Sequence, residues 1–213
     1  MEIYQTENEQ EESLRRWWEA NGKSFLIITL LLLAAVIGWQ QWDAHQKGQA
    51  AAASQLYETI NQVVVTDITQ AVELGRGLMA QQPNSHYATL TALLLAKAEV
   101  ERGDLKAAEA QLQWVINQNS DPAFVRLATL RMARVLLAQG RGNEGLLLLD
   151  QDKTLDTETF AGLANEVRGD IHLAQGDKAQ ARDAYRKAQE TLANTSGKSR
   201  ELQLKLDDLA VAN

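Results

Sequence analysis

Residues 169–188 read GDIHLAQGDKAQARDAYRKA, and this stretch has the form of two helices joined by a tight turn. Gly176 and Asp177 mark the turn. Glycine readily adopts the left-handed backbone that ends a helix, and aspartate can cap the next helix by accepting a backbone N–H bond. Ala181 follows five residues after Gly176, where a small side chain lets two helices approach closely. The stretch therefore predicts a helical hairpin.

The same pattern recurs upstream at a nearly constant spacing. A glycine followed by a polar residue occurs at Gly103, Gly140 and Gly176, at steps of 37 and 36 residues, and another step of 37 residues back reaches Thr66-Asp67. A small residue stands five positions beyond the start of each pair, at Ala71, Ala108, Gly145 and Ala181. Four units at such a period indicate an array of helical repeats.

The rest of the C-terminal part also favours helix. The chain contains only 2 prolines, and Asp121-Pro122 predicts a helix start, because proline needs no N–H donor in the first turn. Residues 200–213 place Leu202, Leu206 and Leu209 on one face. We expect a capping helix there, after a loop at 194–199, because the last apolar face of a solenoid must be covered.

A long apolar run lies near the N-terminus. Residues 25–39 read FLIITLLLLAAVIGW without a charge, and extension through Trp42 gives 18 residues, whereas a membrane span needs roughly 17–25. Four of the five tryptophans flank the run, where an interfacial aromatic belt lies. A buried core helix would have apolar flanks, and a signal peptide would have a short basic start. We therefore expect an uncleaved transmembrane helix over 25–42.

Basic residues near the span predict its orientation. Arg15, Arg16 and Lys23 precede the span, and only Lys47 follows it closely. Because basic residues are retained in the cytoplasm, we expect the N-terminus inside and the large C-terminal part in the periplasm. The expected domains are a cytoplasmic acidic tail and juxtamembrane segment (1–24), the transmembrane helix (25–42), the repeat domain (43–192), and a C-terminal loop and capping helix (193–213).

The composition and the spacing of the histidines do not indicate a catalytic site. Cysteine is absent, and the net charge of −7 argues against nucleic acid as a partner. The three histidines, His45, His86 and His172, have no metal-ligand spacing. We expect no catalytic residue, no cofactor and no metal.

One motif favours an enzyme at first sight. Residues 140–145 read GRGNEG, which matches the G-x-G-x-x-G pattern of dinucleotide-binding turns. Such a turn must follow a strand, but the preceding residues have helical periodicity. Gly140 and Gly145 have roles in the repeat, as the glycine that ends a helix and as the small contact residue. Only Gly142 lacks one, and we expect it to loosen the turn.

Candidate partner-binding residues follow from the repeat register. Lys97, Arg134 and Asp170 occupy equivalent positions in successive first helices, which line the concave surface of a solenoid. Arg131 belongs to a basic cluster with Arg134 and Arg126, for which a solvated face and a peptide-binding surface are alternatives. In the span, the small residues Ala34, Ala35 and Gly38 permit close approach of another helix, although lipid contact is an alternative.

The last repeat unit resembles the tetratricopeptide repeat, whose period is about 34 residues. Gly169 and Gly176 fit the two glycines of that family, and its small, aromatic and small positions fit Ala181, Tyr185 and Ala188. In the first unit, Ala71 and the closing Pro83 fit. Ala96 and Ala133 stand where the family prefers glycine, so the middle units depart from the pattern.

The order of segments resembles the YfgM-type ancillary subunit family of the bacterial SecYEG translocon. The resemblance rests on three segments: the N-terminal NEQEESLRRWWEANGK, the span FLIITLLLLAAVIGWQQW and the closing GDKAQARDAYRKA. It implies a non-enzymatic inner-membrane scaffold that associates with SecYEG and with the periplasmic chaperone PpiD, and that passes newly translocated polypeptides to folding factors. The alternatives are a membrane-tethered adaptor of a different envelope complex and a nucleotide-dependent enzyme that uses GRGNEG.

Overall fold

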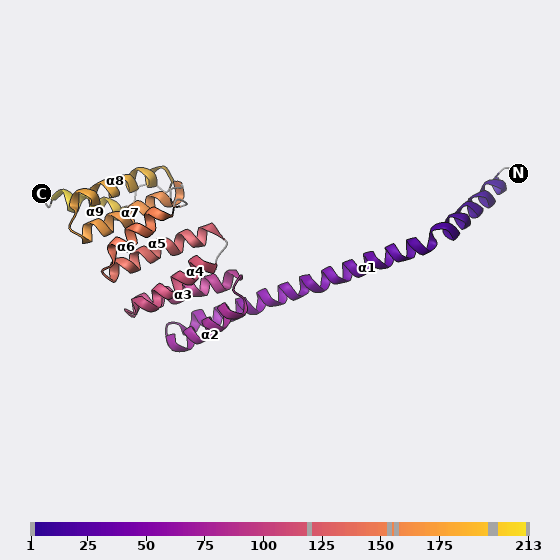
Figure 1. Cartoon of the computed structure of the whole chain (residues 1–213), viewed down its shortest axis with the longest axis horizontal. Helices are drawn as coiled ribbons and strands as arrows, with labels where there is room; N and C mark the ends of the chain where they lie inside the picture. The colour runs from indigo at the N-terminus through magenta and orange to yellow at the C-terminus, as the bar shows by residue number, and fades with distance from the viewer. Residues whose placement is uncertain (1–2, 119–120, 153–154, 156–157, 196–199, 212–213) are drawn as a thin grey trace. The chain divides into compact units, whose positions relative to one another are not determined.

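The structure, a computed structural model, describes residues 3–118, 121–152, 155, 158–195 and 200–211. These segments contain helices and no strand, which confirms the all-α fold class. The chain divides into two units, Met1–Ala52 and Ala53–Asn213. The helices (Figure 1) are α1 (Ile3–Val63), α2 (Ile68–Gln81), α3 (His86–Glu101), α4 (Leu105–Gln118), α5 (Pro122–Ala138), α6 (Gly142–Gln151), α7 (Glu158–Ala174), α8 (Lys178–Thr195) and α9 (Arg200–Val211).

The first unit is the long N-terminal part of α1. Among the described residues, α1 is the one helix that is long and apolar enough to cross a membrane. Only 6% of its most apolar 18-residue window is buried within the chain, and Leu30 is 69% exposed. A core helix of a water-soluble domain would be largely buried, so this helix has an apolar surface that requires lipid or another protein.

Helix α1 is longer than the apolar run at residues 25–42 from which a transmembrane helix was predicted. α1 continues past Trp42 without a break and ends at Val63, inside the second unit. Both prolines, Pro83 and Pro122, lie beyond α1, and the residues after the span are rich in alanine and glutamine, which favour helix. The last turns of α1 therefore provide the first helix of the first hairpin. In that hairpin, Ala53 and Ile60 pack with Ala71 and Leu78 of α2.

Three of the turns between paired helices share one backbone geometry. Gly103, Gly140 and Gly176 have φ angles of +82°, +77° and +82°, and no other described residue has a positive φ. In each turn the N–H of the next residue donates to the carbonyl five residues earlier, for example Asp104 to Glu99 at 2.9 Å. This is the Schellman pattern that ends a helix. The turn positions predicted from the 36- and 37-residue spacing are confirmed.

Aspartates begin the second helices, as the sequence predicted. The carboxylates of Asp67, Asp104 and Asp177 each accept a backbone N–H bond at 3.0 Å from the first turn of the following helix. Asp121 caps α5 in a similar way, with a bond from Ala123 at 2.8 Å. The third hairpin has Arg141 at this position, and its side chain makes no cap.

Small residues lie where the paired helices meet. Ala71, Ala108 and Ala181 are fully buried. A methyl group added at Gly145 would lie 3.1 Å from the carbonyl oxygen of Ala133 on α5. The predicted contact role of these four positions is confirmed.

The expectation for Gly142 is wrong. Gly142 does not loosen the turn; it is the first residue of α6 and is buried. A methyl group there would lie 3.0 Å from Cγ2 of Ile171 on α7 and 3.2 Å from the Gln175 amide. Gly142 therefore allows close approach between neighbouring hairpins, a constraint that operates between repeats and leaves no trace in the pattern within one repeat.

Helix α9 covers the end of the array. Leu202 and Leu209 are 1% and 3% exposed, and they pack with Leu206 against Tyr185 and Leu192 of α8. Helix α8 extends to Thr195, two residues into the expected loop. The rest of that loop, 196–199, lies outside the described residues. Figure 1 shows α2 to α9 following one another as successive hairpins, so that each contacts its neighbours.

Replacement of Gly145 tests the close contact between α5 and α6. We expect Gly145→Val to reduce the free energy of unfolding by about 1–3 kcal/mol, because overpacking displaces α6 from α5. Gly77→Ala in α2 is the control, since a methyl group there has no neighbour within 4 Å, and it should gain about 0.5–1 kcal/mol of helix stability. Urea unfolding of the detergent-solubilised chain, followed by circular dichroism, measures both changes. Equal stability of the two variants would contradict the packing role.

Candidate partner-binding surface

A hollow lies between the first helices of two successive hairpins. Helices α3 and α5 form its walls and α4 forms its floor, and its volume is about 350 Å³. The lining is mostly apolar and includes Val100, Leu105, Leu112, Val135 and Ala138. We call this the α3–α5 hollow. A volume of this size is at the lower end of the range for ligand pockets.

Three of the residues singled out from the repeat register lie around this hollow. Lys97 comes from α3, and Arg131 and Arg134 come from α5. The Lys97 ammonium lies 3.7 Å from the Glu101 carboxylate, and both side chains are well exposed. Arg131 is partly buried and Arg134 is exposed. Burial, and then the nearby positive charge of Arg134, lower the pKa of the Arg131 guanidinium below its ordinary value. The hollow thus has an apolar interior and a basic rim.

The apolar interior was not anticipated from the sequence. Val100 is 42% exposed although it is an apolar residue of a repeat helix. Helical periodicity separates an apolar face from a polar one, but it does not reveal which apolar positions the neighbouring hairpin leaves uncovered. Leu112 on α4 and Val135 on α5 are buried beneath the opening. The alternation of apolar and basic residues along α5 was the available signal.

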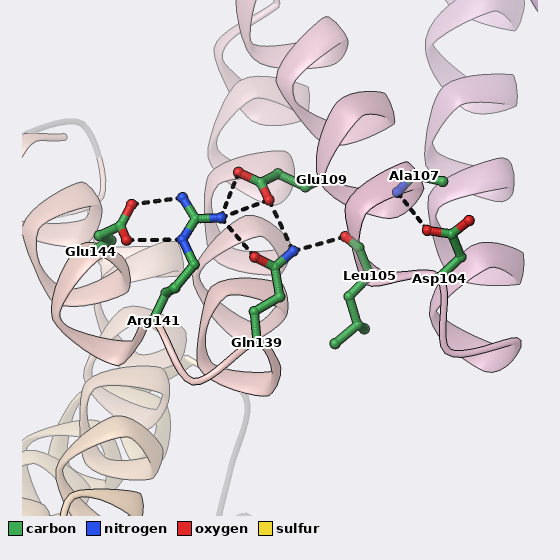
Figure 2. A network of polar contacts seen from close by, with 7 residues as sticks. All are labelled: Asp104, Leu105, Ala107, Glu109, Gln139, Arg141 and Glu144. Atoms are coloured by element: carbon green, nitrogen blue, oxygen red, sulfur yellow. Dashed lines mark hydrogen bonds and ion pairs between the residues drawn. The ribbon is translucent and has the colours of Figure 1, made fainter.

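A polar network holds the helices that form the hollow. Figure 2 shows Arg141, which replaces the capping aspartate of the other turns, between two carboxylates. Its guanidinium donates to Glu109 of α4 at 2.8 Å and to Glu144 of α6 at 2.6 Å. Gln139 donates to Glu109 at 2.9 Å and to the carbonyl of Leu105 at 3.0 Å. Because Leu105 also lines the hollow, the network connects the floor of the hollow to the turn between α5 and α6.

The network favours the charged form of its carboxylates. Hydrogen bonding from Gln139 is the largest influence on Glu109; burial opposes it, Arg141 adds to it, and the net pKa of Glu109 is lowered. Hydrogen bonding from Arg141 likewise lowers the pKa of Glu144. Both groups are therefore anionic at neutral pH and paired with a permanent cation.

Asp170 lies in a separate polar cluster beside the capping helix. The Lys205 ammonium of α9 donates to Asp170 and to Glu166 at 2.8 Å each. The Tyr185 hydroxyl also donates to Asp170 at 2.8 Å. Burial, and then Asp170, raise the pKa of the Tyr185 phenol. Asp170 lies on α7 and therefore does not line the α3–α5 hollow with Lys97 and Arg134; Lys205 of α9 engages its carboxylate instead.

The remaining singled-out residues lie on α1 in the first unit. Ala34, Ala35 and Gly38 are exposed, and a methyl group at Gly38 would have no neighbour within 4 Å. The three basic residues before the apolar run are also exposed. Arg15 lies 3.4 Å from Glu19 and Arg16 lies 3.6 Å from Glu12. Lys23 follows Arg16 about two helical turns later.

The GRGNEG motif does not have the geometry of a dinucleotide site. Helix α5 precedes Gly140, whereas the dinucleotide motif requires a strand at that place. The motif forms a helix–turn–helix connection, and its Arg141 and Glu144 side chains are engaged in the network of Figure 2.

Replacement of Glu109 tests the network through its pH dependence. The lowered pKa means that Glu109 stabilises the fold above its ordinary value of 4.5, and that this contribution is lost as pH falls through the folded-state pKa. We expect Glu109→Gln to lower the melting temperature at pH 7, and the difference from the wild type to shrink below pH 4.5. Glu190→Gln, at an exposed carboxylate on α8, is the control. A difference that is independent of pH would contradict the role of the Glu109 charge.

Comparison with known proteins gives a consistent result over nearly the whole chain. The tetratricopeptide repeat-like domain family matches residues 15–211. A protein of Escherichia coli (strain K12) named ancillary SecYEG translocon subunit is 31% identical over 211 residues, which cover 99% of this chain and 100% of that protein. Proteins of the same name are 32% identical in Haemophilus influenzae (88% of this chain, 91% of that protein) and 28% identical in Neisseria gonorrhoeae (98% and 100%).

These names fit the structural features already described. One apolar N-terminal helix and translocon-associated relatives fit a single-pass protein of the inner membrane. The repeat-like domain of this chain, together with relatives named as ancillary subunits, fits an adaptor role. From its repeat-like domain and its full-length similarity to these relatives, the chain belongs to the family of ancillary SecYEG translocon subunits.

Proposed function

We propose that this chain is a non-enzymatic, membrane-anchored protein-interaction scaffold of the SecYEG translocon. In this role it links newly translocated polypeptides to periplasmic chaperones such as PpiD. The observation that carries the proposal is the combination of an apolar helix with a repeat domain that has an open, apolar hollow with a basic rim. An anchor beside an exit channel raises the local concentration of such a surface for emerging chains.

The proposed topology places the N-terminus in the cytoplasm and the repeat domain in the periplasm. Its determinants are Arg15, Arg16 and Lys23, which act through the retention of basic residues on the cytoplasmic side. The proposed segments are 1–24 for the cytoplasmic tail, 25–42 for the span, 43–192 for the repeat domain and 193–213 for the closing loop and helix. The lipid bilayer is the partner of the span.

The proposed contact residues fall into two groups. Lys97, Arg131 and Arg134 contact polypeptide partners at the α3–α5 hollow, and Asp170 contributes at the far end of the array through its polar cluster. Ala34, Ala35 and Gly38 allow another transmembrane helix to approach α1 closely. The exposure of all three small residues supports this use of the span.

Co-purification in gentle detergent tests the association. We expect the tagged full-length chain to recover both SecYEG and PpiD, because the anchor and the repeat domain hold the complex together. A chain with residues 25–42 replaced by an unrelated apolar span is the matched control, and it should recover less SecYEG. Absence of SecYEG and PpiD, with enrichment of another envelope complex, would favour the alternative of a tethered adaptor elsewhere in the envelope.

A reporter enzyme that is active only in the periplasm tests the topology. Fused after Asn213 it should be active, because the positive residues hold the other end of α1 in the cytoplasm. The same reporter fused before Met1 is the control and should be silent. A silent C-terminal fusion at normal protein levels would reverse the proposed orientation.

A further inference from the structure

The α3–α5 hollow lies next to a second hollow. A neighbouring hollow of about 450 Å³ lies between the end of α1 and α3, and it is lined by Asn61, Val64 and Thr66 among others. Lys97 and Glu101 line both hollows. The two hollows are therefore adjacent at Lys97 and Glu101 and together extend along three successive first helices; we call the pair of hollows the repeat groove. Such a groove suits an extended chain better than a compact ligand.

Arg131 and Arg134 provide the positive charge on the α5 side of the repeat groove, whereas the carboxylate of Glu101, which also lines the groove, lies beside Lys97 on α3. Among the described residues, the side chains of Arg131 and Arg134 have no ion pair or hydrogen bond, although the whole chain has a net charge of −7. Arg131 is partly buried next to another guanidinium, which is an unfavourable place for a positive charge without a partner. An anionic group bound there would offset both the burial and the repulsion between the two arginines.

The interior of the same hollow is apolar and accessible. Val100 is 42% exposed at its opening, and Ala138 is exposed beside it. A free phosphate would contact the arginines but would leave this apolar surface uncovered. A ligand that places an apolar side chain on Val100 and a carboxylate at Arg131 and Arg134 would satisfy both features.

We propose that the repeat groove binds an extended polypeptide segment in which apolar side chains alternate with acidic ones. This inference rests on the proposed function as a protein-binding scaffold and names the chemistry of the bound segment. In an extended chain, side chains two residues apart lie on the same face at a separation of about 7 Å, and their neighbours point the other way. In an extended chain that lies between the two walls, apolar residues can therefore face Val100 on α3 while acidic residues face Arg131 and Arg134 on α5. Asn61 and Thr66 supply polar groups for the peptide backbone at the other end.

Fluorescence anisotropy with a defined peptide tests the proposal. The probe is a short fluorescein-labelled peptide of alternating leucine and aspartate, titrated with the full-length chain in phosphatidylcholine nanodiscs. We expect saturable binding that weakens with added salt, because the carboxylates pair with partly exposed arginines. Peptides with asparagine in place of aspartate, or with serine in place of leucine, should each bind about tenfold more weakly.

Variants of the groove locate the binding site. Arg131→Gln with Arg134→Gln should weaken binding about tenfold, and Arg131→Lys with Arg134→Lys should restore most of it. Val100→Asp, at an exposed position, should also weaken binding by placing a carboxylate on the apolar surface. Arg186→Gln with Lys187→Gln, at exposed basic residues of α8, is the matched control and should bind as the wild type does. Unchanged circular dichroism melting shows that each variant is folded.

Several outcomes would overturn the proposal. One is that a leucine–lysine peptide binds as tightly as the leucine–aspartate peptide. Another is that the Arg131→Gln, Arg134→Gln variant binds the probe as tightly as the wild type does. A third is that inorganic phosphate or short-chain phosphatidylglycerol displaces the probe. If the wild type recovers SecYEG but fails to bind the probe, the inference about the groove fails and the proposed function stands. If the probe binds but SecYEG is not recovered, the proposed function fails instead.

Discussion

The positive φ angles of Gly103, Gly140 and Gly176 reverse the chain between paired helices, and the stacking of the hairpins depends on these turns. A residue with a Cβ atom adopts this left-handed backbone only at a cost of roughly 1–2 kcal/mol. Each turn places a small residue of the second helix against the first helix, as Gly145 lies against Ala133. The separation of successive first helices, and with it the width of the groove between them, follows from this close packing.

The turn at Gly140 differs from the other two because the residue at its capping position does not cap the next helix. Arg141 stands where the neighbouring turns have aspartate, and its guanidinium joins α4, the α5–α6 turn and α6. Exposed ion pairs of this kind contribute little stability individually. The network matters more for the position of the helices than for stability. Gln139 also donates to the carbonyl of Leu105, a residue that lines the α3–α5 hollow. The loss of a helix cap is offset by a link between two hairpins next to the groove.

Sequence reasoning identified the features that repeat and missed those that depend on neighbours. The Gly-Asp spacing predicted the turns, the caps and the contact residues, since each is determined within one hairpin. The roles of Gly142 and Arg141 were not predicted, because each side of the contact belongs to a different repeat. The repeat register grouped Asp170 with Lys97 and Arg134 but could not reveal that Lys205 of the capping helix lies against Asp170. The apolar run predicted a span, whereas the length of α1 depends on the absence of a helix-breaking residue before Val63.

The side chains that line the repeat groove explain how a chain with a net negative charge can bind acidic polypeptide segments, as proposed above. The net charge of −7 describes the whole molecule, whereas the partly buried Arg131 and its neighbour Arg134 determine the field at one opening. Over a distance beyond about 8–10 Å, salt screens the remaining charges at physiological ionic strength. Local charge and apolar exposure, rather than net charge, therefore govern what this surface binds.

Site-specific photocrosslinking in membranes tests most directly whether this surface contacts translocating polypeptides. A photoreactive phenylalanine analogue placed at Val100 samples the groove, and one at Lys187 samples an exposed position on α8. With a polypeptide arrested during translocation, we expect adducts to that polypeptide or to its chaperone from position 100 and few from position 187. Adducts at position 187 with none at position 100, from chains present at equal levels, would contradict the account.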